Sequence, residues 1–145
     1  VKQYRVDYSK INILTNSLYD SPNIMAMLGY KRNRPEIEDK TNSIYEYYND
    51  KSIHAKSYSF DNEIAVIGSF NMDPRSSFLS SESYFVVYDQ ELTKALNNKI
   101  EKLKKSSYKS DDEAIRDDIV DNKYRLKLFL LKILSPFSYF FEELL

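Results

Sequence analysis

The only histidine of the chain lies close to other side chains that could act on a phosphate ester. The stretch IHAKSYSFDNEIAVIGSFNMDPRS contains His54 and Lys56 near its start and Ser69 and Asn71 near its end. An imidazole can attack phosphorus or move a proton. An ammonium supplies a point charge, while a hydroxyl and an amide supply directed hydrogen bonds to phosphoryl oxygens. These residue types therefore predict a phosphate site in which His54 is the reactive group.

A hairpin would bring these four groups together. The sequences IHAKSYSF and EIAVIGSF favour two strands joined by a two-residue turn at Asp61 and Asn62. Such a turn places Ser69 opposite His54 and gathers the four groups on one face, whereas a turn of odd length would shift the register and scatter them. Seven residues of strand span roughly 23 Å. Asp61 is therefore too far from His54 to orient it, and we expect Asp61 to have a structural role.

Two features beyond the hairpin would complete the site. Asp73 and Pro74 are typical of the N-cap and first position of a helix, whose free backbone amides favour an anion. Glu82 begins the next expected strand and would return to the same end of the sheet as Ser69. A carboxylate that accepts from one ring nitrogen of His54 would leave the other nitrogen free to attack.

Strands and helices are expected to alternate along the chain, which is typical of an α/β fold. The remaining expected elements are strands at residues 11–15, 43–48 and 82–89, a short helix after Asp73, and helices at residues 24–39 and 90–105. Gly29 and Pro35 argue for an interruption of the helix at residues 24–39.

The chain divides into three expected segments. Residues 1–105 would form the catalytic unit, residues 106–118 a solvated linker rich in serine and charge, and residues 119–145 an apolar helical tail. The tail is too short and too charged to span a bilayer, which needs about 20 uninterrupted apolar residues. We expect it to dock on the domain or on a neighbour, with an interfacial membrane helix as the alternative.

The composition is that of one globular domain. The 145 residues are 42% hydrophobic and 30% charged, with a formal net charge of -1. Global charge thus gives no argument for binding to nucleic acid or to a membrane. Because the chain has one histidine and no cysteine, we expect no metal. No signal peptide is visible after Val1.

The spacing of the chemical residues resembles the signature of the phospholipase D superfamily. That signature is represented here by His54, Lys56, Asp61, Gly68, Ser69 and Asn71. The stretches ILTNSL, GYKRNR and GSFNMDPRSSFLSSE are also similar to the C-terminal half of bacterial cardiolipin-synthase-like proteins. That branch has asparagine before the glutamate where this chain has Ser81.

The resemblance implies a fold, a reaction and a set of roles. The fold would be one half of a two-domain α/β protein, with a mixed β-sheet flanked by helices. The reaction would be ping-pong phosphodiester transfer through a phosphohistidine, without a cofactor. The implied roles are those of His54 as one of two catalytic histidines, Lys56 and Asn71 as phosphate ligands, Ser69 as a supporting donor, Glu82 as the group that orients His54, and Asp61, Gly68, Asp73 and Arg75 as structural residues of the motif.

A phospholipid substrate and a second protein segment follow from the same resemblance. One imidazole cannot occupy both apical positions of the displacement, so a second histidine must come from an N-terminal half with its own motif or from a homodimer partner. We favour the N-terminal half, because the chain starts abruptly at INILT. The isolated chain is then expected to be inactive, and the whole protein to be bacterial and associated with a membrane surface or the cell envelope.

Two alternatives stay open. The first is a homodimeric endonuclease of the same superfamily, but nucleic acid is disfavoured because the basic cluster lies outside the motif, where it is typical of a solvated helix face. That cluster comprises Lys99, Lys102, Lys104, Lys105 and Lys109. The second is a catalytically incomplete binding domain, which is disfavoured because all six motif residues are present.

Overall fold

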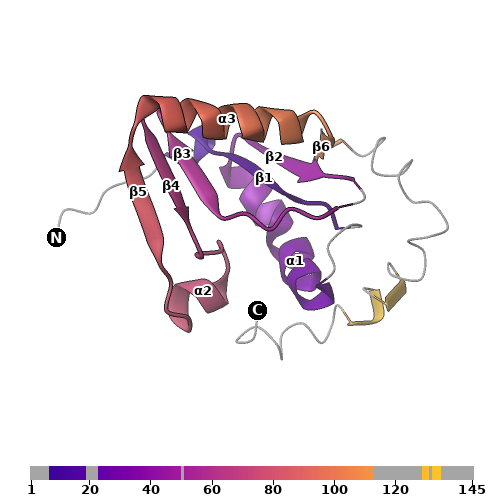
Figure 1. Ribbon diagram of the computed structural model, residues 1–145. Helices are drawn as coiled ribbons and strands as arrows, with labels where there is room; N and C mark the ends of the chain where they lie inside the picture. The colour runs from indigo at the N-terminus through magenta and orange to yellow at the C-terminus, as the bar shows by residue number, and fades with distance from the viewer. Residues whose placement is uncertain (1–6, 19–22, 50, 113–128, 131, 135–145) are drawn as a thin grey trace.

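The computed structural model describes residues 7–18, 23–49, 51–112, 129–130 and 132–134, in which helices and strands alternate (Figure 1). The elements are β1 (Asn12–Asn16), α1 (Ile24–Lys40), β2 (Ser43–Tyr47), β3 (Ser57–Phe60), β4 (Ile64–Gly68), α2 (Pro74–Phe78), β5 (Tyr84–Tyr88), α3 (Gln90–Lys104) and β6 (Ser107–Lys109), preceded by a 3-10 turn at Tyr8–Lys10. The predicted α/β class is confirmed.

The strands form two three-stranded sheets in the described part of the chain. The first has the order β1-β2-β6 and is mixed, with β1 parallel and β6 antiparallel to β2. The second has the order β3-β4-β5 and is antiparallel. The parallel pair needs a crossover connection, and α1 supplies it. Helix α3 lies along both sheets and contacts β2, β3, β4 and β6, so it connects them (Figure 1).

The hydrophobic core is small and lies where α1 packs against the first sheet. Leu18, Met27 and Leu28 form a buried cluster, and Ile44 of β2 is also buried. Helix α1 continues unbroken from Ile24 to Lys40, so the expected interruption at Gly29 and Pro35 was wrong. Because the tertiary packing of one helix face outweighs local propensity, a single proline does not end the helix.

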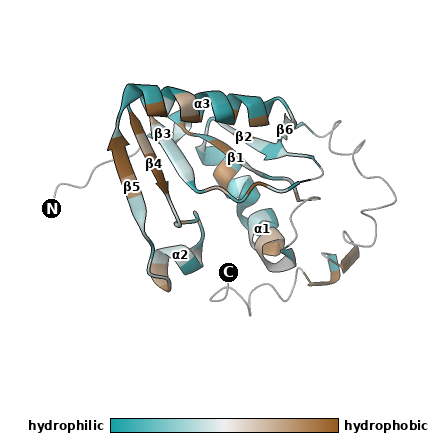
Figure 2. Cartoon of the chain, viewed as in Figure 1, coloured by the Kyte–Doolittle hydropathy of each residue, from teal (hydrophilic) through white to brown (hydrophobic). Residues whose placement is uncertain are grey.

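Helix α3 and the second sheet differ in hydropathy. Figure 2 shows strongly hydrophobic residues in β4 and β5, whereas much of α3 is hydrophilic. Asp89 caps α3 by accepting a hydrogen bond from the amide of Leu92 at 2.7 Å, and Thr93 is fully buried. The helix expected at residues 90–105 is therefore confirmed.

The predicted linker at residues 106–118 does not begin at its expected boundary. Ser107–Lys109 forms β6, which pairs with β2, and Tyr108 and Ser110 are buried. The start of this segment therefore belongs to the folded domain, because β6 extends the first sheet by pairing with β2. Residues 113–118 and most of the tail lie outside the described residues, and the segmentation otherwise stays a prediction. Among the described residues, no helix is long and apolar enough to cross a membrane.

The register of the β3–β4 hairpin differs from the prediction. Phe60 pairs with Ile64, not with Glu63, so the connection has three residues and the predicted register was wrong by one. The amide of Glu63 still closes the turn on the carbonyl of Phe60 at 3.0 Å, but Glu63 is left out of the ladder. Asp61 and Asn62 have φ values of 52° and 60°, a region that these two residue types tolerate.

Candidate active site

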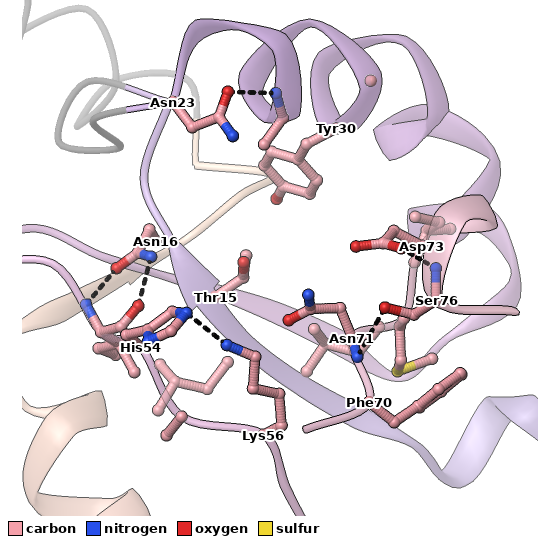
Figure 3. A pocket seen from close by; sticks show the side chains of 18 of the residues that line it. Thr15, Asn16, Asn23, Tyr30, His54, Lys56, Phe70, Asn71, Asp73 and Ser76 are labelled. Carbon is pink, nitrogen blue, oxygen red and sulfur yellow. Dashed lines mark hydrogen bonds between the residues drawn. The ribbon is translucent and has the colours of Figure 1, made fainter. Parts of the chain in front are cut away.

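A cleft of about 880 Å³ lies beside β1 and α1 and contains most of the predicted site. His54, Lys56 and Asn71 line it, and Figure 3 shows their side chains pointing toward one another. Ser69 instead lines a neighbouring hollow, which it shares with those three residues. The reactive groups therefore gather as predicted, although the register that was expected to gather them was wrong. The groups still lie together because His54 and Lys56 precede β3, so the alternation of side chains along that strand does not determine which way they point.

His54 and Lys56 contact each other directly. The Lys56 Nζ lies 2.5 Å from the His54 Nε2. Because an ammonium can only donate, Nε2 would be the acceptor in this contact. His54 is exposed and Lys56 is half-buried. The Nε2 of His54 thus lies next to a cation that could instead bind a phosphate oxygen.

The segment that carries Asn71 is fixed by hydrogen bonds to its backbone. The Tyr58 hydroxyl donates to the carbonyl of Phe70 at 2.9 Å, and the amide of Asn71 donates to the Ser76 hydroxyl at 3.3 Å. Burial raises the pKa of Tyr58, and the charges of Asp73 and Glu82 raise it further, so this hydroxyl stays protonated and able to donate. Asn71 itself is exposed and free to meet a ligand.

Ser69 and Glu82 form a second polar pair. The Ser69 hydroxyl donates to the Glu82 carboxylate and accepts from the amide of Ser83 at 3.1 Å. The pKa of Glu82 is lowered by hydrogen bonds from Ser69 and Ser76, and less strongly by the positive charge of Lys56. In the described residues, Glu82 thus binds hydroxyl groups and not the imidazole. Its orienting role and the phosphate-binding role of Ser69 both stay predictions.

Gly68 and Asp61 occupy positions with clear structural demands. A Cβ atom on Gly68 would lie 2.3 Å from the carbonyl oxygen of Ser83 and 2.5 Å from the Cβ of Tyr84. Only glycine therefore allows β4 to approach β5 this closely. Asp61 lies in the hairpin turn with positive φ, which agrees with the structural role expected for it.

Asp73 caps α2 as predicted, while the anion site expected at this helix start stays a prediction. The Asp73 carboxylate accepts from the amide of Ser76 at 2.7 Å, which occupies one of the free amides with a negative group. Helix α2 is also only five residues long. Arg75 is exposed and lines the cleft, where its charge helps to lower the pKa of Glu82.

Two features of the site were missed by the sequence analysis. The Asn16 side chain forms two hydrogen bonds with the backbone of Ile53, the residue before His54. A polar residue at the end of an apolar strand was the only signal for it. The second is the buried carboxylate of Glu46. In the sequence, only its position as an acidic residue within the expected strand SIYEYY could have indicated it.

Glu46 is the centre of a buried polar cluster behind the cleft. Its side chain is fully buried and accepts from the Tyr30 hydroxyl at 2.8 Å, the Arg34 Nη1 at 3.0 Å and the Tyr108 hydroxyl at 2.6 Å. Tyr30 also lines the cleft (Figure 3). Burial raises the pKa of Tyr30, and the negative charge of Glu46 raises it further, which keeps the hydroxyl protonated. The cluster thus connects the cleft wall to α1, β2 and β6.

The part of the chain described by the structure holds no group of three or more histidine, cysteine, aspartate or glutamate residues placed to bind a metal ion.

The chain is similar to known proteins over most of its described length. The family model described as "Cardiolipin synthase, PLD-like domain" matches residues 8–104. The chain is 33% identical over 107 residues to cardiolipin synthase C of Escherichia coli, covering 62% of this chain and 23% of that protein. It is 29% identical over 144 residues to cardiolipin synthase 1 of Staphylococcus epidermidis, covering 90% and 28%.

An uncharacterized protein of Helicobacter pylori is 33% identical over 87 residues, covering 51% of this chain and 17% of that protein. The chain thus spans less than a third of the length of each of these curated relatives. No solved structure matches the chain significantly.

Proposed function

Because the chain belongs to the family of cardiolipin synthase, phospholipase D-like domains, we propose that it is the C-terminal catalytic half of a phosphatidyltransferase or phosphodiesterase acting on phospholipids. One observation carries the proposal: His54, Lys56 and Asn71 point into the same cleft, with an ammonium beside the imidazole (Figure 3). A nucleophile or acid, a cation and an amide are the groups that phosphodiester displacement requires.

The reaction would proceed in two displacements. In the first, a histidine nitrogen attacks phosphorus, a P–N bond forms, the P–O bond to the leaving alcohol breaks, and a general acid protonates that oxygen. In the second, the group that acted as general acid now takes a proton from an acceptor alcohol or water. The oxygen of that alcohol or water attacks phosphorus, and the P–N bond breaks. Lys56 and Asn71 would stabilise the charge on the equatorial oxygens. His54 would serve as the nucleophile or as the general acid.

A second histidine is required, and it would come from an N-terminal half or from a homodimer partner. The aligned region covers only 23% and 28% of the two cardiolipin synthases, so such proteins have room for a second motif. Phe85 and Tyr88 on β5 are 77% and 80% exposed, and β5 is an edge strand of its sheet. A large exposed apolar surface is typical of a protein interface and supports a covering partner. The isolated chain would be inactive.

The proposed substrate is a phospholipid presented at a membrane surface, and the proposed location is the membrane or envelope of a bacterial cell. The support is that two relatives of the chain are cardiolipin synthases of bacteria. Nucleic acid is not part of the proposal.

The test is conversion of phosphatidylglycerol vesicles by the full-length protein with His54 intact or replaced by alanine. We expect His54→Ala to lower turnover at least about 100-fold, because general acid–base catalysis alone contributes about 10²–10⁴-fold. Asn98→Ala, an exposed change on α3 away from the cleft, is the matched control and should keep full turnover. Turnover by His54→Ala at the rate of the unchanged protein would remove the proposed function.

A further inference from the structure

The side chain of Asn16 bonds both backbone groups of Ile53. Its Nδ2 donates to the Ile53 carbonyl at 2.8 Å, and its Oδ1 accepts from the Ile53 amide at 2.6 Å. The two residues are 37 positions apart in the sequence, so the contact joins distant parts of the chain. Figure 3 shows the pair of bonds next to His54.

This contact replaces strand pairing at the edge of a sheet. Asn16 is the last residue of β1, which is an edge strand in the order β1-β2-β6. Ile53 belongs to the segment before β3, which is an edge strand of the other sheet. No ladder joins β1 to this segment in the described residues. One amide side chain therefore supplies the donor and the acceptor that a neighbouring strand would otherwise supply.

His54 lies between two anchors that belong to different sheets. On its N-terminal side, Asn16 fixes Ile53 to the end of β1. On its C-terminal side, the amide of Gly68 donates to the carbonyl of Lys56 at 3.0 Å and fixes that residue to β4. Loss of the first anchor would free the backbone of His54 but would leave that of Lys56 in place.

We propose that Asn16 is the positioning residue that sets the imidazole of His54 against the bound phosphodiester; this inference rests on the function proposed above. Asn16 lines the cleft, but in the described residues its side chain bonds the backbone of Ile53 and no hydrogen bond joins it to Lys56 or Asn71. Its removal therefore acts on the chemical step through His54 and not on phosphate binding through Lys56. A misplacement of about 1 Å in a reacting group can lower a rate about 100-fold.

The kinetic test compares Asn16→Ala with a matched variant in the full-length protein, using phosphatidylglycerol vesicles. The matched variant is Asn97→Ala, which removes one hydrogen bond to Asn62 at 2.7 Å that also joins distant segments but lies outside the cleft. We expect Asn16→Ala to lower kcat about 100-fold with KM within twofold, and Asn97→Ala to change neither. A loss of kcat that equals that of Asn97→Ala, or that comes with an equal rise in KM, would overturn the inference.

A second measurement does not depend on activity. The imidazole resonance of His54, assigned by its loss in His54→Gln, should shift or broaden in Asn16→Ala and stay unchanged in Asn97→Ala. The Ile53 amide should also exchange its hydrogen at least about tenfold faster, because its acceptor is gone. If the unchanged protein shows no turnover, the proposed function fails. An unaltered His54 resonance with unaltered Ile53 exchange would then still refute the role of Asn16.

Discussion

Replacing Glu46 by alanine should destabilise the protein by about 3 kcal/mol, because one buried and two partly buried donors lose their shared acceptor. The Glu46 side chain is fully buried, and that of its partner Arg34 is 14% exposed. Removing one member of a buried ion pair typically costs about 3–5 kcal/mol, since the remaining charge is left in a medium that solvates it poorly. The lower end applies here, because Arg34 keeps some solvent contact and a second carboxylate, Glu38, lies 3.5 Å from its Nε.

The neutral replacement Glu46→Gln should cost less than alanine. The amide oxygen can still accept from one of the two tyrosine hydroxyls, whereas the charge that balances Arg34 is lost. A hydrogen bond to a charged group is worth about 1.5–3 kcal/mol, so we expect a loss of about 2 kcal/mol. The double variant Arg34→Met/Glu46→Leu should lose less than the sum of its single changes, because no buried charge remains.

Equilibrium unfolding in urea measures these differences as shifts of the midpoint at constant slope. Glu36→Ala is the matched control, since Glu36 is an exposed glutamate on α1 whose ion pair with Lys40 lies in solvent. Its midpoint should stay where it is in the unchanged protein. A Glu46→Ala midpoint that coincides with that of the control would refute the view that this cluster stabilises the fold.

Two further predictions concern the β4–β5 contact. Ser69→Ala should raise the pKa of Glu82 toward its ordinary value, because the hydrogen bond from Ser69 is the largest cause of its lowering; an NMR titration of the carboxyl carbon that shows no rise would contradict this assignment. The Glu82 contribution to stability is present above its unfolded pKa and is lost as pH falls through the lower folded value, so Ser69→Ala should weaken the acid resistance of the fold. Gly68→Ala should lower the thermal midpoint by the equivalent of about 1–3 kcal/mol or more, because its methyl group would meet the Ser83 carbonyl, and an unchanged midpoint would show that β5 can move away.

The sequence predicted the composition of the site better than its geometry. The types and spacing of His54, Lys56 and Asn71 indicated phosphoryl chemistry, and the structure gathers all three in one cleft. The register failed because Glu63 is left out of the ladder, and no glycine marks that position. Two consecutive residues with positive φ are stabilised by the finished hairpin, and a local pattern cannot report that.

The contacts that hold the site in place could not be read from the sequence for a related reason. Asn16 and Ile53 are distant in the chain, and so are Glu46 and Tyr108. A polar residue in or beside a strand indicates only that its side chain needs a hydrogen-bond partner. Which partner it finds depends on the packing of the two sheets around α1 and α3. The same dependence on tertiary packing explains why β6 was not predicted. It is a strand of three residues that pairs with β2, and its Tyr108 donates a hydrogen bond to Glu46.

The openness of the cleft has an energetic consequence for the proposed reaction. His54 and Asn71 are exposed, so a phosphodiester bound there would be screened by water. Two unit charges 4 Å apart interact by about 1 kcal/mol in water but by about 4 kcal/mol at the effective dielectric of a protein surface. A partner that covers the cleft would therefore strengthen the attraction of Lys56 for the phosphate as well as supply the second histidine. If the proposed second histidine comes from such a partner, the isolated chain would lack both one of the two groups that act at phosphorus and the low dielectric that makes its own cation effective.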